Sequence, residues 1–303
     1  MDVVRVGITG ASGFVGRNLS EYLKQKGIEV VDLKLRGGYK KEYLNGLSAI
    51  IHLAGKAHDL KGKAQLDEYI AVNTKLTADL YIDFLSSEVP VFCYMSTVKA
   101  VADHASEVVT EAMVSAPTTS YGISKQRAEA FILSQKPAEA KRTYILRPCM
   151  IHGPGNKGNL NLLYKFVSKR IPYPLAAFHN QRSFLSIENL CYVIDQLIER
   201  TDIPSGIYHV ADSEPISTNE LIQLIGETLE RKPIMLSVPQ IFIKIFSGIG
   251  DVLRLPFNSH VLHKLTEDYT VSNEKIVKAI GIPLPIEAKA GLRKTLSSFL
   301  HVK

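Results

Sequence analysis

A glycine-rich turn near the start of the chain most constrains what it can fold into. Residues 3–8 form a β-rich apolar run, and residues 17–26 form a helix-forming segment. Between them Gly10, Gly13 and Gly16 stand in a GxxGxxG spacing. A turn without bulky side chains lets the amides at a helix start approach an anion, and Gly16 lets helix and strand pack closely. The pattern predicts a site for the diphosphate of a dinucleotide.

The alternation of strand and helix continues beyond this turn. Further strands are expected at 29–33, 49–54, 91–95 and 144–146, and further helices at 66–85 and 124–134. Such alternation predicts a parallel sheet covered by helices. After about Gly153 the alternation fades and prolines interrupt the chain. This part is expected to form a smaller, irregular region that covers the substrate.

Composition excludes several classes of protein. Of 303 residues, 46% are hydrophobic and 22% charged, which excludes a disordered, collagen-like or coiled-coil chain. The net charge of +6 is spread along the sequence, so no nucleic-acid-binding arm is expected, and an anionic small molecule suits it better. The three cysteines are too few and too far apart for a disulfide framework or a zinc site. Their number is typical of a reducing cytoplasm.

Neither an export signal nor a membrane span is expected. The first twenty residues lack a basic segment before an apolar run, so they do not resemble a signal peptide. The most apolar later stretch, 234–257, is interrupted by Lys244, Asp251 and Arg254. No uncharged run there is long enough to cross a bilayer, so this stretch predicts a packed or interfacial helix.

A tyrosine and a lysine form the second chemical signal. Lys125 follows Tyr121 by four residues, which puts both side chains on one face of a helix. Thr97 follows the predicted strand 91–95, so its hydroxyl could meet this pair at the carboxyl edge of the sheet, where ligands bind. The same spacing occurs at Tyr22 and Lys26, but no hydroxyl partner precedes it, and a solvated helix face is expected there.

Together these pieces resemble an extended short-chain dehydrogenase/reductase of the nucleotide-sugar epimerase/dehydratase family, over nearly the whole length. The matching segments are 9–16, 52–55, 72–73, 96–97, 121–125, 147–148, 153–155 and 182–185. The resemblance implies an α/β fold with a Rossmann-type doubly wound parallel sheet and a smaller C-terminal substrate-binding domain. It also implies that 1–155 bind NAD(P), that 182–211 return to that domain, and that 156–303 mainly bind substrate.

The resemblance also assigns roles to single residues. Tyr121 would act as acid and base, and Thr97 would hydrogen-bond the reacting oxygen. Lys125 would hold the nicotinamide ribose and, with an oxidised nicotinamide, would lower the pKa of Tyr121. Arg182 and Asn159 would contact the diphosphate of the substrate, although Asn159 could equally cap a helix. The predicted cofactor contacts are Gly10, Gly13, Phe14, Val15, Gly16, Lys34, Arg36, Leu53, Ala54, Gly55, Ser96, Tyr121, Lys125 and Pro148.

Two further residues bear on the cofactor and the framework. Lys34 stands where NAD enzymes of the family carry an acid for the ribose, while Asp32 lies two residues earlier. Lys34 and Arg36 suit a 2′-phosphate, so NADP is favoured over NAD, and both stay open. Asn73 matches a family position that ties strands together.

The reading that results is a cytoplasmic, NAD(P)-dependent enzyme acting at C4 of a UDP-hexose. A 4-epimerase, such as a UDP-glucose or UDP-N-acetylhexosamine 4-epimerase, and an NADPH-dependent 4-keto-sugar reductase of surface-polysaccharide synthesis are nearly level. A catalytically inactive dinucleotide-sensing protein is the third alternative. Dehydration is not expected, because Val98 and Lys99 replace the acidic pair of the dehydratases. A homodimer through 66–85 and 124–134 is a family expectation, and His260 and His263, without a third ligand in the sequence nearby, predict no metal site.

Overall fold

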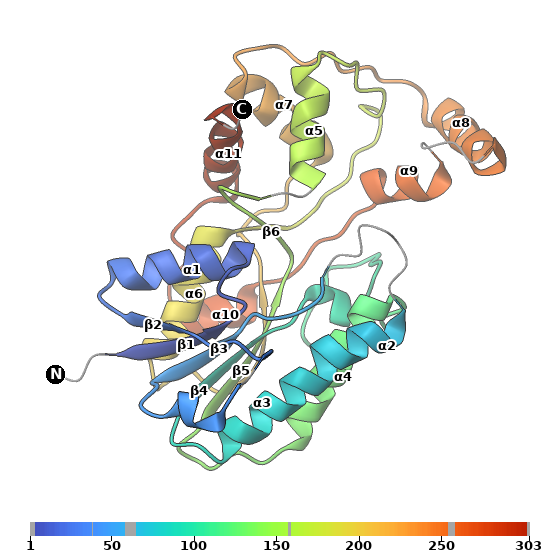
Figure 1. Ribbon diagram of the computed structural model, residues 1–303. Coiled ribbons are helices and arrows are strands. Elements are labelled where there is room, and N and C mark those ends of the chain that lie inside the picture. Colours follow the sequence, from blue (N-terminus) through green and yellow to red (C-terminus); the bar gives the residue numbers. More distant parts are fainter. Residues whose placement is uncertain (1–3, 38, 58–64, 157–158, 254–257, 302–303) are drawn as a thin grey trace.

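The computed structural model describes residues 4–37, 39–57, 65–156, 159–253 and 258–301. Figure 1 shows a sheet with helices on both faces and a smaller helical region above it. The six strands are β1 (Arg5–Thr9), β2 (Glu29–Asp32), β3 (Ala49–His52), β4 (Val91–Met95), β5 (Arg142–Pro148) and β8 (Gly206–Val210).

The sheet has the order β2-β1-β3-β4-β5-β8, and all its strands are parallel. Every residue of β3 and β4 is buried, because helices cover both faces of the sheet. The strand order reverses direction between β1 and β3, and ligands of such sheets bind at the carboxyl ends of the strands around that point. The predicted Rossmann-type doubly wound sheet is therefore confirmed.

Different helices cover the two faces. One core packs the sheet against α1 (Phe14–Gln25), α6 (Ile187–Glu199) and α10 (Glu274–Ile280). The other packs it against α3 (Leu76–Leu85) and α4 (Ser120–Ser134). A short helix α2 (Leu66–Tyr69) and a π-helical turn at Ile70–Lys75 lead into α3, and 3-10 turns stand at Lys41–Leu44, Val98–Ala100 and Phe299–His301.

The smaller region is helical. It contains α5 (Asn159–Ser168), α7 (Thr218–Thr228), α8 (Gln240–Leu253), α9 (Ser259–Thr266) and α11 (Ala288–Ser298). Its core joins Leu221, Ile225 and Leu292 with apolar side chains from the other helices. Ser217 and Glu220 begin α7 with a reciprocal capping box, which satisfies two backbone donors at the helix start.

A buried polar network joins this region to the sheet. The short parallel pair β6 (Met150–His152) and β7 (Phe184–Ser186) leads from one to the other. Asp212 accepts hydrogen bonds from the Ser186 amide at 3.0 and 3.1 Å and from the Asn189 side chain at 2.7 Å. His152 lies 3.5 Å from the same carboxylate and shares a 2.8 Å hydrogen bond with Thr295 of α11. These buried polar contacts therefore tie the smaller region to the sheet.

The prolines after Gly153 do break the chain into short pieces, but two of those pieces belong to the sheet layer. β8 pairs with β5, so the chain does return to the sheet after Arg182. α10 packs on the same face as α1, which the sequence did not suggest. The exact domain boundaries stay a prediction. Of the helices described here, none combines the length and the apolar character that crossing a membrane requires.

Candidate active site

The glycine-rich turn leaves no room for side chains at two of its positions. Gly10 has a φ of 71°, and a Cβ atom there would lie 2.9 Å from the Ala54 amide nitrogen. A Cβ atom on Gly16 would lie 2.3 Å from the Gly10 carbonyl oxygen. The turn is closed by a 2.9 Å hydrogen bond from the Gly13 amide to the same carbonyl. The glycines therefore bring α1 and the segment after β3 against the turn.

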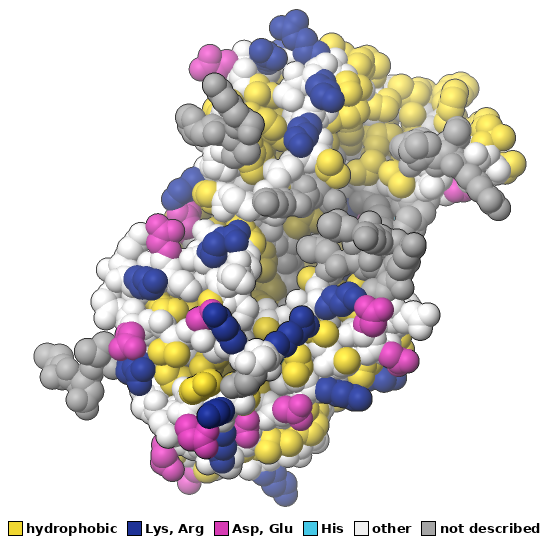
Figure 2. Space-filling model, in the orientation of Figure 1, with side chains coloured by type: hydrophobic (Ala, Val, Ile, Leu, Met, Phe, Trp, Pro, Cys, Tyr) yellow, Lys and Arg dark blue, Asp and Glu magenta, His cyan; other side chains and the backbone are white. Residues whose placement is uncertain are grey.

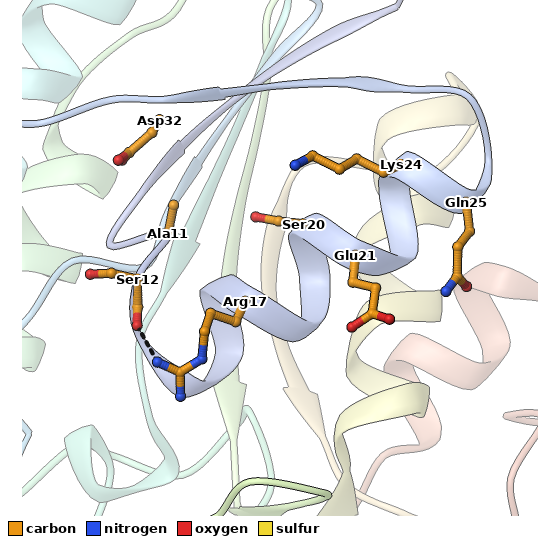
Figure 3. Close-up of a pocket in the computed structure, with 8 residues that line it drawn as sticks. All are labelled: Ala11, Ser12, Arg17, Ser20, Glu21, Lys24, Gln25 and Asp32. Carbon is orange, nitrogen blue, oxygen red and sulfur yellow. Dashed lines mark hydrogen bonds between the residues drawn. The ribbon is translucent and has the colours of Figure 1, made fainter.

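A pocket of about 680 Å³ opens beside this turn (Figure 3). Ala11, Ser12 and Asp32 line it, together with α1 residues that include Arg17, whose guanidinium donates a 2.7 Å hydrogen bond to the Ser12 carbonyl. Gly13 offers α1 no side-chain cap, and the first turn of α1 carries no acid. The amides at this helix start suit a dinucleotide diphosphate, and the Asp32 carboxylate suits ribose hydroxyls.

Lys125 is buried at the carboxyl end of β4. Its ammonium donates a 2.7 Å hydrogen bond to the Met95 carbonyl and lies 4.7 Å from the centre of the Tyr94 ring. Burial lowers the pKa of Lys125 to about 8, although the Glu129 carboxylate opposes the shift. The segment after β3 also comes close, because a Cβ on Gly55 would lie 3.2 Å from this ammonium.

Tyr121 stands one helical turn before Lys125 and is partly exposed. Burial raises its pKa to about 12, while a hydrogen bond with the Thr97 hydroxyl lowers it. The Tyr69 ring packs edge-on against the Tyr121 ring at 6.4 Å. In the protein alone, burial therefore outweighs the expected lowering, and the expected effect of an oxidised nicotinamide stays a prediction. Thr97 is 8% exposed and follows β4, so the three predicted catalytic residues meet at one edge of the sheet.

Asn73 holds α4 against the segment after β3. Its amide oxygen accepts from the Lys56 amide at 2.7 Å, and its Nδ2 donates to the Lys56 carbonyl at 3.0 Å and to Ser124 Oγ at 2.9 Å. The expectation that Asn73 ties strands together is therefore corrected, since it ties a loop to α4. The π-helical turn adds one residue to the helical turn and points this side chain inward.

A buried ion pair between Arg147 and Glu129 joins β5 to α4. Arg147 bonds Glu129 through Nε at 2.9 Å and through Nη2 at 2.5 Å, and the Ser96 hydroxyl donates to the same carboxylate. Because the Ser96 hydroxyl is bonded to Glu129, the structure does not support a contact of this side chain with the cofactor. The predicted cofactor contact of Ser96 stays a prediction.

Asp103 anchors the start of α4. It accepts hydrogen bonds of 2.6 to 2.9 Å from the amides and hydroxyls of Thr118 and Thr119. Burial alone would raise the pKa of Asp103, but these four hydrogen bonds lower it. Because Thr119 is the N-cap of α4, this contact fixes the start of the helix that carries Tyr121.

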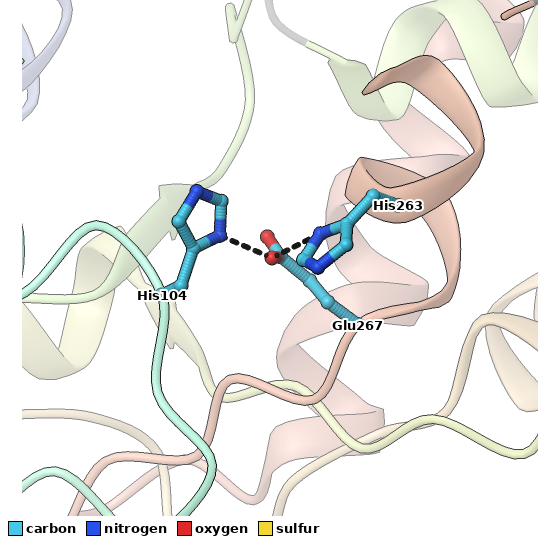
Figure 4. A group of neighbouring side chains, drawn as sticks. All are labelled: His104, His263 and Glu267. Atoms are coloured by element: carbon cyan, nitrogen blue, oxygen red, sulfur yellow. Dashed lines mark hydrogen bonds and ion pairs between the residues drawn. The ribbon is translucent and has the colours of Figure 1, made fainter. Parts of the chain in front are cut away.

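Arg182 lies beside Glu267 in the segment that precedes β7. Its guanidinium lies 4.0 Å from the Glu267 carboxylate, and its backbone pairs with Ile216. His104 Nδ1 and His263 Nδ1 lie 2.7 and 2.9 Å from one oxygen of Glu267 (Figure 4). The donor atoms of these three residues all lie within 4.8 Å of one another. Glu267 follows His263 by four residues, so the sequence offered this carboxylate, whereas the approach of His104 is visible only in the structure. The prediction of no metal stays untested.

The remaining predicted residues are distributed around this site. Phe14 and Val15 form the first turn of α1, Leu53 and Ala54 follow β3, and Pro148 ends β5. Lys34 and Arg36 are exposed beyond β2, and Arg36 lines a second pocket with Gly55 and Lys56. The side chain of Asn159 lies outside the described residues, as does that of His260.

Sequence reasoning missed the residues that support the site. Glu129, Asp103 and His104 carry no local motif, because their partners are 15 to 163 residues away in the chain. Glu129 and Glu267 did offer a signal, since they stand one helical turn after Lys125 and His263 respectively.

Comparisons with known proteins agree with this geometry. Residues 6–211 match the model of the NAD dependent epimerase/dehydratase family. A UDP-glucose 4-epimerase of Vibrio cholerae is 28% identical over 318 aligned residues, covering 97% of this chain and 95% of the relative. The N-acetyl-alpha-D-glucosaminyl-diphospho-ditrans,octacis-undecaprenol 4-epimerase of Escherichia coli O157:H7 is 24% identical, covering 98% and 96%.

A solved structure shows the same fold. The UDP-glucuronic acid 4-epimerase of Bacillus cereus in complex with NAD superposes with a TM-score of 0.77 at 15% identity, covering 99% of this chain and all of the other. The family match spans the glycine-rich turn, the Tyr121–Lys125 pair and the sixth strand of the sheet. The chain belongs to the NAD-dependent epimerase/dehydratase family.

Proposed function

We propose that the protein is a 4-epimerase that acts at C4 of a UDP-hexose with a bound NAD(P). One observation carries the proposal: Tyr121, Lys125 and Thr97 meet at the carboxyl edge of the sheet, below the glycine-rich turn. The two relatives at 28% and 24% identity are both named 4-epimerases, which supports the same carbon. The nucleotide, the sugar and the cytoplasmic location belong to this proposal.

The glycine-rich turn and Gly55 would hold the dinucleotide, which would supply reversible hydride chemistry for inversion at C4. Tyr121 takes the proton of the C4 hydroxyl and later gives it back, because its phenol oxygen can hold either state. Thr97 hydrogen-bonds the same oxygen and keeps it within reach of Tyr121. Lys125 holds the cofactor ribose and, as an ammonium, favours the phenolate.

Inversion at C4 requires that the sugar turns while its carrier stays fixed. Arg182 is the cation we assign to the carrier diphosphate, since a guanidinium binds two phosphate oxygens in a planar fork. In the structure its guanidinium faces Glu267, so a bound diphosphate would compete with that carboxylate. Asn159 is proposed as a second contact, and a homodimer through 66–85 and 124–134 remains part of the proposal.

The reductase is the second candidate, favoured by Lys34 and Arg36, which are exposed beyond β2 where a 2′-phosphate would lie. A reductase would use NADPH once and release NADP. A catalytically inactive dinucleotide-sensing protein would bind the cofactor at the same turn without using Tyr121.

Replacing Tyr121 with Phe tests whether the site is catalytic. Removal of one acid/base group is expected to lower kcat by a factor of about 10² to 10⁴. Dinucleotide affinity, measured by fluorescence titration, should stay within about twofold, because the glycine-rich turn is unchanged. Tyr22→Phe, the other tyrosine with this spacing, is the matched control and should keep full turnover. Full turnover by Tyr121→Phe would support the sensing protein.

The dinucleotide that remains with the purified protein separates the two reactions. An epimerase recycles its cofactor within each turnover, so tightly held NAD is expected on release by denaturation. An empty protein that prefers NADPH and reduces a 4-keto sugar would contradict the epimerase and support the reductase.

A further inference from the structure

Helix α8 presents most of its apolar side chains to solvent. Ile243, Ser247 and Gly250 are buried at a spacing of four and three residues and form the face toward α9. The other large side chains point away from the protein, with Phe242, Phe246 and Val252 57%, 68% and 82% exposed. A narrow stripe of α8 therefore packs against the protein, and the wider apolar face of the helix is exposed.

The apolar surface continues along the segment that leads into α8. Two 2.8 Å backbone hydrogen bonds join Tyr173 to Ile234 and Leu236, so this segment runs beside the one that carries Ile171. Ile171, Ile234 and Leu236 are all more than two-fifths exposed. We call the whole patch the α8 surface; it consists of Ile171, Ile234, Leu236, Ile241, Phe242, Ile245, Phe246, Ile249, Val252 and Leu253. Figure 2 shows it as yellow side chains along the upper right of the molecule.

A patch of this kind needs a partner. Monomeric soluble proteins rarely expose contiguous apolar areas beyond a few hundred Å², and larger ones mark interaction sites. A helix of 14 residues is about 21 Å long, which is too short to cross a bilayer but suits a helix that lies in its surface.

The charges around the α8 surface indicate which partner it fits. Lys165, Lys169, Arg170, Arg231 and Lys232 are all exposed at the end of α5 and just after α7. Residues 159–182 contain no Asp or Glu; the exposed Glu230 precedes Arg231, and Asp251 is the only acid in 231–253. Figure 2 shows Lys and Arg side chains at the top of the molecule, next to the yellow area. An apolar face rimmed by cations suits an anionic lipid surface.

We propose that the α8 surface docks the protein on an anionic phospholipid membrane, with α8 lying in the headgroup region. A second copy of this chain fits less well, because pairing the same face would bring two basic rims together. Docking would bring Glu267 and its neighbour Arg182 towards the membrane, since α9 packs against α8 and leads directly to Glu267. The proposal does not depend on the epimerase reaction.

Vesicle flotation tests the proposal with the full chain. Wild-type protein should float with vesicles of phosphatidylcholine containing about 30% phosphatidylglycerol, and much less with phosphatidylcholine alone. The double variant Phe242→Glu/Phe246→Glu should bind at least tenfold more weakly, because two charges enter the apolar face. Ile282→Glu is the matched control; its side chain is 55% exposed but lies outside the α8 surface, and binding should not change.

The basic rim gives a second, independent measurement. Lys169→Gln/Lys232→Gln should weaken binding roughly fivefold for each lysine, and raised salt should weaken the wild type in the same way. Turnover of a UDP-sugar without vesicles should be unchanged in every variant, which separates this result from the epimerase proposal. The proposal is overturned if wild type does not float with the anionic vesicles, or if the phenylalanine variant instead abolishes a dimer.

Discussion

At the scale of single residues, the site rests on polar groups that are fully enclosed. His52 ends β3 and is completely buried between two hydroxyls, Thr9 Oγ1 at 2.7 Å and Thr77 Oγ1 at 2.8 Å. Thr9 also accepts a 3.0 Å hydrogen bond from the Ala54 amide beside the glycine-rich turn. Burial lowers the pKa of His52 to about 3, and the Lys125 ammonium adds to this shift. A neutral imidazole therefore joins three segments beneath the cofactor site.

The low pKa of His52 predicts a loss of stability in acid. Between pH 6.5 and 3 the unfolded chain binds a proton that the folded protein does not, so the free energy of unfolding falls as the pH falls. From pH 7 to 4.5 this group alone should cost roughly 2–3 kcal/mol. Urea unfolding of wild type and His52→Gln at both pH values isolates it, and the variant should lose less. Equal losses would show that His52 is not the group responsible.

Lys34 carries the expected preference for NADP. Lys34→Asp replaces a partner of the 2′-phosphate with a repelling charge, so the ratio of NADP to NAD affinity should fall about tenfold or more. Titration of the stripped protein with both dinucleotides measures the ratio. Lys40→Asp, an exposed lysine farther along the same segment, is the control. An unchanged ratio would assign cofactor choice to Asp32, which lines the pocket beside the turn.

At the scale of elements, the glycine-rich turn leaves no room for a side chain at Gly16. In Gly16→Ala the new Cβ would meet the Gly10 carbonyl and Ala11 Cα at 2.3 and 2.7 Å, so backbone must move. We expect a loss of about 1–3 kcal/mol in the free energy of unfolding and weaker dinucleotide binding. Gly248→Ala in α8 meets nothing within 4 Å and should leave both quantities unchanged or improved. Thermal unfolding and a dinucleotide titration test the pair.

The sequence predicts those elements whose signals are local. β4 begins and ends as expected, β2 and β3 lie within the expected runs, and β1 ends one residue beyond its expected run, because buried β-rich segments are bounded by turns. β6 and β7 have three residues each, which is too short for any period to show. α10 reads as an ordinary amphipathic helix, and only the tertiary fold decides that it packs on the sheet.

The sequence predicted more of the residues near the glycine-rich turn and α4 than of those near Arg182. Local patterns identify Gly10 and Gly16 in the glycine-rich turn, Lys125 in its spacing from Tyr121, and Thr97 after a strand. These positions lie near one another because the strands of a parallel sheet end at the same edge. The contact of His104 with Glu267 joins residues 163 apart, and no spacing in the sequence reports it. The surroundings of Arg182 and Glu267 therefore could not be predicted from the sequence.

At the scale of the whole molecule, the Asp212 network holds the two regions together. Asp212→Ala would leave the Ser186 amide and the Asn189 side chain without their buried acceptor. We expect a loss of about 2–4 kcal/mol in stability and a lower Tm. Asp202→Ala removes a carboxylate that is 66% exposed, and it should change the Tm little despite its ion pair with Arg200. Differential scanning calorimetry of both variants distinguishes a buried junction from a surface pair.

Because α10 packs on the sheet, a single cut in the chain does not separate the sheet from the smaller region. The family match ends at residue 211, yet Ile276 and Ile280 complete the core that covers the sheet. A fragment cut at that point would expose the hydrophobic side of α6 and β8. Exchanging the part after residue 211 between relatives as one C-terminal block would therefore yield chimeras with mismatched cores. Recombination would have to keep 269–281 with the dinucleotide half and cut the chain on both sides of it.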